Sequence, residues 1–170
     1  MEQGLVHLYW GEGKGKTTAA MGLALRALGN GRGVTVVQFL KGAPTGEAPL
    51  LEQLGARVLR GQPGQKFVFQ MTEEEKAACR AAETQRLREA LASPCDLLVL
   101  DEACAAAELG MVDEALLKSA VLRRPAGREV VLTGRGPATW MLEAADYSTE
   151  MRCHKHPYEQ GVPARKGVEY

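Results

Sequence analysis

The sequence predicts an α/β protein that is built around a parallel β-sheet. Short apolar segments alternate with longer segments of helical character along the 170 residues. Strands that are separated by helices favour a parallel sheet with right-handed crossover connections. The first apolar segment, residues 5–10, is followed by the glycine-rich stretch 11–18 and then by an Ala/Leu-rich segment at 19–28. This order indicates a strand, a phosphate-binding turn and a helix.

Each further element has a local signal. Four more strands are expected in short apolar segments, at residues 34–40, 96–100, 129–133 and near 147–151. A long helix is expected to start after Thr72 and to run to about residue 92, because Thr72 can cap it and Glu75 stands at the capping-box position. Shorter helices are expected at 113–122, capped by Asp113, and at 137–144.

Two segments depart from the alternation. Residues 43–70 are rich in Gly, Pro and Gln, and we expect a long, substrate-facing loop there with at most a small strand at 57–59. Residues 157–170 form a polar, glycine-containing tail. The length favours one domain over residues 1–170, and the 45% of hydrophobic residues are enough to bury a core.

Composition argues against several classes of function. The chain has 21 Lys and Arg against 21 Asp and Glu, so no overall charge would attract nucleic acid or lipid. It contains neither an apolar run long enough to span a bilayer nor a secretory leader before the first strand. We therefore expect no nucleic-acid or membrane partner.

The cysteines favour a cytoplasmic protein with reduced thiols. The four of them show no paired zinc spacing and no dense disulfide framework. The run Cys153-His154-Lys155-His156 could also be interpreted as a metal cluster. That interpretation is the less favoured one, because four clustered ligands at known spacings are absent from the sequence.

The glycine-rich stretch predicts a site for a nucleoside triphosphate. Glycines let the backbone approach a polyphosphate closely, and the helix N-terminus adds positive charge. Lys16 is placed to reach a phosphate, and the Thr17 hydroxyl is placed to ligate Mg²⁺. The candidate ATP-binding residues are Gly11, Glu12, Gly13, Lys14, Gly15, Lys16, Thr17 and Thr18.

This P-loop is irregular. The usual Gly-x-x-x-x-Gly-Lys-Ser/Thr motif has its first glycine where this chain has Trp10, and the nearest glycine, Gly11, lies one residue closer to Lys16. A second lysine, Lys14, stands inside the loop. The phosphate site is therefore expected to differ from that of an ordinary ATPase.

Charged residues follow two of the expected strands. Asp101 and Glu102 come after the apolar segment 97–100, which would place a carboxylate beside the phosphates to hold Mg²⁺; the alternative is a helix-capping acid. Arg135 follows the next strand and should face the same crevice, because ligands of open α/β sheets bind at the carboxyl ends of strands. A surface arginine in a turn is the alternative.

Two of the three phenylalanines, Phe67 and Phe69, stand two residues apart in the expected loop. If this segment is extended, both rings lie on one side of it. From composition alone, a hydrophobic anchor that holds the loop to the domain is slightly the better interpretation.

Together these residues resemble the P-loop type of ATP:corrinoid adenosyltransferase, over almost the whole chain. The combination of the P-loop variant with the Val-Gln-Phe-Leu-Lys-Gly segment is specific to that family. The matching segments are 11–18, 36–42, 98–102, 132–135, 149–151, 155–157 and 164–170. The resemblance implies a single P-loop NTPase-like (RecA-like) domain with a parallel sheet flanked by helices.

The resemblance also implies a reaction. A reduced corrinoid, with cobalt(I) as the nucleophile, attacks C5′ of ATP and expels triphosphate, in adenosylcobalamin biosynthesis or salvage. The resemblance implies that ATP binds to the P-loop in reversed polarity, which leaves C5′ exposed to the corrinoid. It implies that the catalytic groups are Lys16, Lys14 and Arg135. It also implies that Mg²⁺ is bound by Thr17, Asp101 and Glu102. An electron donor such as a flavoprotein reductase and a homodimer are implied as well.

For Phe67 and Phe69, the resemblance implies contact with the corrin face in place of the lower cobalt ligand. Relatives often have a tryptophan at the second position. Some also have an extended N-terminal segment, which is not expected here because the first strand starts near Leu5. The alternatives to adenosyl transfer are a P-loop ATPase or kinase, which releases ADP, and a non-catalytic ATP sensor.

Overall fold

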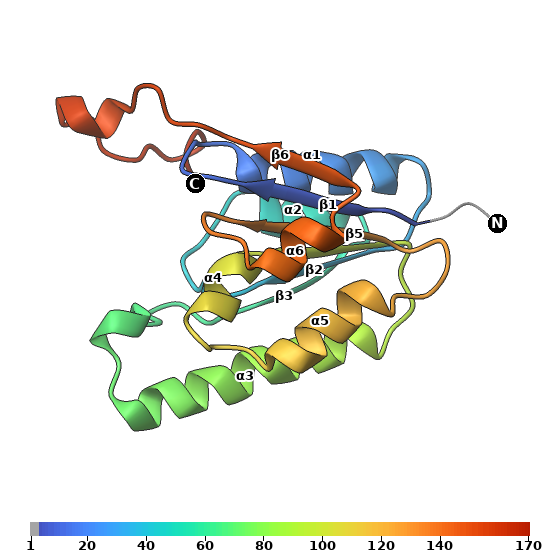
Figure 1. Ribbon diagram of the computed structural model, residues 1–170. Coiled ribbons are helices and arrows are strands. Elements are labelled where there is room, and N and C mark those ends of the chain that lie inside the picture. The colour runs from blue at the N-terminus through green and yellow to red at the C-terminus, as the bar shows by residue number, and fades with distance from the viewer. Residues whose placement is uncertain (1–3) are drawn as a thin grey trace.

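The structure, a computed structural model, describes residues 4–170; residues 1–3 of the expected domain lie outside the described residues. Its described part contains one sheet of six parallel strands in the order β3-β2-β4-β5-β1-β6 (Figure 1). The strands are β1 (Val6–Trp10), β2 (Val34–Gln38), β3 (Arg57–Arg60), β4 (Leu97–Asp101), β5 (Glu129–Gly134) and β6 (Tyr147–Glu150). The expected P-loop-like α/β fold is confirmed.

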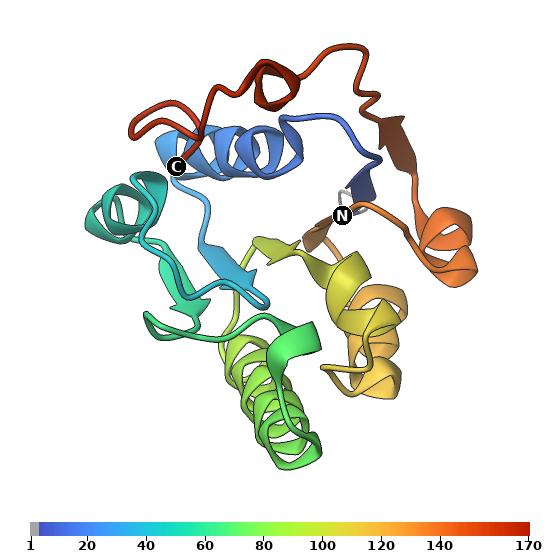
Figure 2. The ribbon, with the colours of Figure 1, turned by 90° about the vertical axis from the view of Figure 1, so that its left-hand side faces the viewer.

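The helices cover both faces of this sheet (Figure 2). The α-helices are α1 (Lys16–Gly29), α2 (Glu47–Gln53), α3 (Glu73–Leu91), α4 (Ala103–Glu108), α5 (Glu114–Leu122) and α6 (Thr139–Ala144). Two short 3₁₀ turns lie at Val68–Gln70 and Pro157–Gln160. No helix within residues 4–170 is both long and apolar enough to cross a membrane.

Each face of the sheet carries its own core. One core joins α1 and α2 to strand residues such as Val36 and Val99, and the other joins α3, α4, α5 and α6 to residues such as Leu98 and Leu100. Successive side chains of a strand point to opposite faces, so the continuous apolar run of β4 supplies both cores. Both faces are therefore covered, as is usual for a parallel sheet.

The capping signals predicted two helix starts correctly. Thr72 Oγ1 accepts from the backbone N–H of Glu75 at 3.2 Å, and the Glu75 carboxylate accepts from the Thr72 N–H at 2.9 Å. Asp113 caps α5 through the N–H of Leu116 at 3.2 Å. Both contacts satisfy donors that a helix N-terminus leaves without a partner.

The prediction of a loop over residues 43–70 was wrong in part. This segment contains the helix α2 and a 3₁₀ turn, neither of which was expected, whereas the strand β3 confirms the small strand expected at 57–59. Pro49 concealed the helix, although it stands in the first turn, where its missing N–H costs no hydrogen bond. Ala48 and Leu51, three residues apart, are the buried residues of α2. Helix α4 was also not anticipated, and β2 ends at Gln38 rather than at residue 40.

Candidate active site

The P-loop connects β1 to α1 at the carboxyl edge of the sheet, as predicted. Gly11 and Gly15 have φ angles of 105° and 114°, a region that residues with a Cβ rarely adopt. Gly15 is the N-cap, and α1 starts at Lys16. The first N–H groups of a helix have no partner within it, so this turn directs donors and the positive end of the helix dipole at the space above it.

Lys16 is the first residue of α1 and is only partly exposed. Its Nζ donates to the carbonyl oxygen of Gly13 at 2.7 Å. Burial lowers the pKa of Lys16 below its ordinary value, and the negative charge of Glu102 opposes this effect. The ammonium is thus held against the loop where a phosphate would lie.

The end of strand β6 packs directly onto the P-loop. The N–H of Gly13 donates to the carbonyl oxygen of Met151 at 2.6 Å, and the N–H of Met151 donates to the oxygen of Trp10 at 2.7 Å. A Cβ at Gly13 would lie 2.7 Å from the Met151 carbonyl group. The close approach of the segment that follows β6 therefore requires a glycine at this position.

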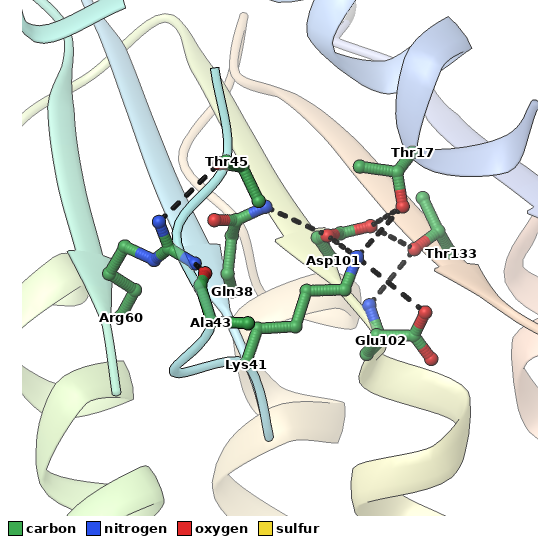
Figure 3. A network of polar contacts seen from close by, with 9 residues as sticks. All are labelled: Thr17, Gln38, Lys41, Ala43, Thr45, Arg60, Asp101, Glu102 and Thr133. Carbon is green, nitrogen blue, oxygen red and sulfur yellow. Dashed lines mark hydrogen bonds and ion pairs between the residues drawn. The ribbon is translucent and has the colours of Figure 1, made fainter. Parts of the chain in front are cut away.

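Asp101 is the centre of a buried polar cluster above strands β2, β4 and β5 (Figure 3). Its side chain is fully buried, and each of its two carboxylate oxygens accepts two hydrogen bonds. Thr17 Oγ1 and Thr133 Oγ1 donate to Oδ1 at 2.9 and 2.6 Å. Gln38 Nε2 and Lys41 Nζ donate to Oδ2 at 3.1 and 2.6 Å. Four donors on one carboxylate fix its position and satisfy both of its oxygens.

Glu102 lies at the rim of this cluster. Its φ angle is 60°, in the left-handed region that is uncommon for a residue with a side chain. The Glu102 N–H donates to Thr133 Oγ1 at 2.9 Å, which helps to hold this backbone conformation. Its carboxylate lies 3.7 Å from Lys41 Nζ. The turn therefore aims a second, more exposed carboxylate at the crevice.

Lys41 is one of three residues of this cluster that the sequence analysis missed, together with Gln38 and Thr133. The segment 36–42 supported the family resemblance, but the lysine itself was given no role. The signal that could have found it is its place just beyond the end of a strand, at the edge where Asp101, Glu102 and Arg135 were already expected.

The remaining P-loop candidates lie around this centre. The carbonyl oxygen of Arg135 accepts from the N–H of Gly11 at 3.1 Å, and its exposed guanidinium lies 3.5 Å from Glu12. The structure thus places Arg135 beside the P-loop. Lys14 and Thr18 are exposed, and Lys14 lines a cavity with residues of the C-terminal tail rather than the Asp101 cluster.

Phe67 and Phe69 protrude from the molecule, 71% and 82% exposed. Their rings are stacked, with centroids 5.6 Å apart and planes inclined by 11°. The segment is a 3₁₀ turn and not the extended chain that the alternation argument assumed. Because both rings bury so little of their surface, the structure does not support the anchor interpretation.

The tail run from Cys153 to His156 is exposed. His156 Nδ1 accepts from the N–H of Tyr158 at 3.1 Å, so this side chain caps the last 3₁₀ turn. In residues 4–170, no cluster of three or more His, Cys, Asp or Glu side chains is arranged to hold a metal ion. All four cysteines are free thiols.

The fold and the P-loop define a nucleotide-binding α/β protein. Comparison with known proteins gives the family: the chain belongs to the ATP:corrinoid adenosyltransferases (BtuR/CobO/CobP), which it matches over residues 2–170. It is 40% identical to the corrinoid adenosyltransferase CobA of Salmonella typhimurium over 171 residues, which are 99% of this chain and 87% of that protein.

Two further relatives are also named corrinoid adenosyltransferases. The Escherichia coli protein is 38% identical over 170 residues, and the aligned region is 99% of this chain and 87% of that protein. The Pseudomonas aeruginosa protein is 37% identical over 172 residues, covering 99% and 85%.

Proposed function

We propose that this protein transfers the 5′-deoxyadenosyl group of ATP to the cobalt of a reduced corrinoid, in adenosylcobalamin biosynthesis or salvage. Cobalt(I) supplies the electron pair of the new cobalt–carbon bond, and the bond from C5′ to the triphosphate oxygen breaks. The oxygen leaves with its bonding pair as part of inorganic triphosphate. The family membership carries this proposal, together with a P-loop that shares one edge of the sheet with two exposed aromatic rings.

The leaving group explains what the P-loop residues are needed for. Triphosphate gains negative charge as the bond breaks, and preorganised donors lower the energy of that state. In this proposal Lys16 and the N–H groups at the start of α1 bind the triphosphate, and Arg135 and Lys14 add positive charge from two sides. The partial burial of Lys16 excludes water, which strengthens its interaction with a phosphate.

The residues present also suit Mg²⁺. This ion prefers oxygen ligands and is usually bound by one or two carboxylates together with substrate phosphates. Thr17, Asp101 and Glu102 offer a hydroxyl and two carboxylates in one cluster, and these residues would hold the ion. When bound, Mg²⁺ would neutralise part of the charge on the triphosphate.

We further propose that Phe67 and Phe69 contact the corrin ring. Two parallel rings that leave most of their surface in solvent offer a flat apolar face, which a planar macrocycle could cover. In this role they would replace the lower ligand of the cobalt and make its reduction easier. An external electron donor, such as a flavoprotein reductase, would supply the electrons.

A homodimer in the cytoplasm completes the proposal. The free thiols are consistent with a reducing compartment, and the dimer is inferred from the family alone. Size-exclusion chromatography with light scattering would test the dimer, and a mass that stays at 18.3 kDa would contradict it.

The phosphate product distinguishes this function from its alternatives. Protein, ATP, Mg²⁺ and a chemically reduced corrinoid are incubated together, and the products are separated by ion-exchange chromatography. We expect triphosphate in equal amount to the adenosylated corrinoid, formed only when the corrinoid is present. ADP with phosphate would indicate an ATPase or a kinase, and bound but unchanged ATP would indicate a sensor; either result would overturn the proposal.

A further inference from the structure

The ammonium group of Lys41 stands where a metal ion would be expected. Its Nζ lies 2.9 Å from Thr17 Oγ1, 2.6 Å from Asp101 Oδ2 and 3.7 Å from Glu102 Oε1. These three oxygens belong to the hydroxyl and the two carboxylates that would hold Mg²⁺. Lys41 thus contacts the complete protein part of the proposed metal site (Figure 3).

The backbone around Lys41 is built to keep it there. Leu40 has a φ angle of 56°, a strained conformation for a branched side chain. The Leu40 N–H donates at 3.1 Å to Glu83, a fully buried carboxylate of α3 that is paired with Arg86 at 2.8 Å. The carbonyl oxygen of Lys41 accepts from the N–H of Gly61 at 3.0 Å. These contacts hold the backbone in place on both sides of the peptide bond that joins Leu40 to Lys41.

Charge balance explains why an ammonium group is needed at this point. Asp101 is fully buried, and a buried carboxylate without a cation is strongly unfavourable. The neighbouring cations have other partners, because Lys16 donates to Gly13 and Arg135 pairs with Glu12. Lys41 is therefore the cation that pairs with Asp101 in the described part of the chain.

We propose that Lys41 is an internal counter-ion of the metal site, which the divalent cation must displace. This inference rests on the Mg²⁺ part of the proposed function. A metal ion on these oxygens would compete with the ammonium, because Mg²⁺ binds oxygen at about 2.0–2.1 Å and two cations held that close together repel each other. The free protein therefore binds a divalent cation weakly, and the metal enters with ATP, whose phosphates supply the missing ligands. Lys41 makes loading of the metal depend on the nucleotide.

Mn²⁺ binding in the absence of nucleotide and corrinoid tests this directly. Mn²⁺ is titrated into wild-type protein and into a Lys41→Met variant, and free Mn²⁺ is measured by electron paramagnetic resonance. We expect the variant to bind one Mn²⁺ at least about tenfold more tightly, because a unit positive charge has been removed from the site. Lys14→Met is the matched control. It removes the same charge from the P-loop without touching Asp101, and we expect less than about a threefold change.

Thermal melts provide a second measurement that needs no activity. In EDTA, Lys41→Met leaves the Asp101 carboxylate buried without a cation, and we expect its melting temperature to fall by roughly 6–15 °C. Millimolar Mg²⁺ should restore most of this loss while leaving the wild type unchanged. The double variant Lys41→Met/Asp101→Asn, which removes the unpaired charge as well, should melt higher than Lys41→Met in EDTA and should gain no affinity for Mn²⁺.

The outcomes separate this inference from the proposed function. If wild-type protein binds Mn²⁺ with ATP, while Lys41→Met without ATP binds it no more tightly than wild type or Lys14→Met, the counter-ion role is wrong and the metal proposal stands. If wild-type protein binds no Mn²⁺ even with ATP, the metal proposal fails and the inference fails with it. Tighter binding by Lys41→Met that Asp101→Asn abolishes supports both.

Discussion

Lys16 is the P-loop residue whose substitution should affect the proposed reaction most. Its ammonium is partly buried and donates a hydrogen bond to the Gly13 carbonyl oxygen. We expect Lys16→Ala to lower kcat/KM for triphosphate release by about a hundredfold or more, since one preorganised donor is typically worth about 3 kcal/mol. Turnover is measured by triphosphate release. Lys76→Ala, which changes a partly exposed lysine of α3, should keep turnover within about twofold of the wild-type value. Near-normal turnover by Lys16→Ala would exclude the P-loop from the reaction.

Asp101 and Glu102 are adjacent in the sequence but differ in their surroundings. Asp101 is fully buried and accepts four hydrogen bonds, whereas the partly exposed carboxylate of Glu102 lies 3.7 Å from Lys41 Nζ. We expect Asp101→Asn to lower the free energy of unfolding by about 3–5 kcal/mol, because it leaves a buried pair half broken. Glu102→Gln should cost less than about 1 kcal/mol. Chemical denaturation of the two variants and of the wild type measures these free energies of unfolding.

Activity across a Mg²⁺ titration then identifies the metal ligand. A variant that has lost a ligand should regain activity at raised Mg²⁺, because added ion compensates for weaker binding. If both variants behave like the wild type at every Mg²⁺ concentration, neither carboxylate takes part in the mechanism.

At the scale of elements, the contact between strand β6 and the P-loop gives a matched pair of glycine substitutions. Gly13→Ala would place a Cβ 2.7 Å from the backbone of Met151, which cannot swing away as a side chain could. We expect it to lower the free energy of unfolding by about 1–3 kcal/mol and to weaken ATP binding. Gly22 lies inside α1 with no atom within 4 Å of an added Cβ, so Gly22→Ala should add about 0.5–1 kcal/mol. A Gly13→Ala protein as stable as wild type would show that β6 does not hold the loop.

The elements also show what sequence reasoning can reach. The strands, the capped helices and the P-loop depend on local signals, and these were predicted with boundary errors of a few residues. Helix α2 was missed because Pro49 and nearby glycines resemble a loop, although proline is tolerated in a first turn. Lys41 was missed because its role depends on Thr17 and Asp101, which are 24 and 60 residues away in the sequence. Such contacts exist only once the parallel sheet has brought the strand ends together.

At the scale of the whole molecule, the P-loop and the phenylalanine pair form two separate parts of one edge. Both segments extend from the carboxyl side of the sheet (Figure 1). The Lys66–Glu75 ion pair at 2.5 Å and the capping box of α3 hold the chain on either side of the rings. The rings themselves contribute little to the core, because most of their surface is exposed. Binding of ATP and contact with the corrinoid should therefore be separable by substitution.

Phe67→Ala and Phe69→Ala test this separation. Neither should lower the melting temperature by more than about 2 °C, because little buried area is lost, and both should leave ATP binding unchanged. If the rings displace the lower cobalt ligand, each variant should lose most of its activity on a corrinoid whose cobalt starts five-coordinate. It should lose much less on one that already lacks the lower ligand, since less remains for the rings to do. Phe39→Ala, at a fully buried position, serves as the contrast and should lose about 3–5 kcal/mol of stability. If each phenylalanine variant loses activity equally on both corrinoids and also melts at a lower temperature, the two rings anchor the loop and do not displace the cobalt ligand.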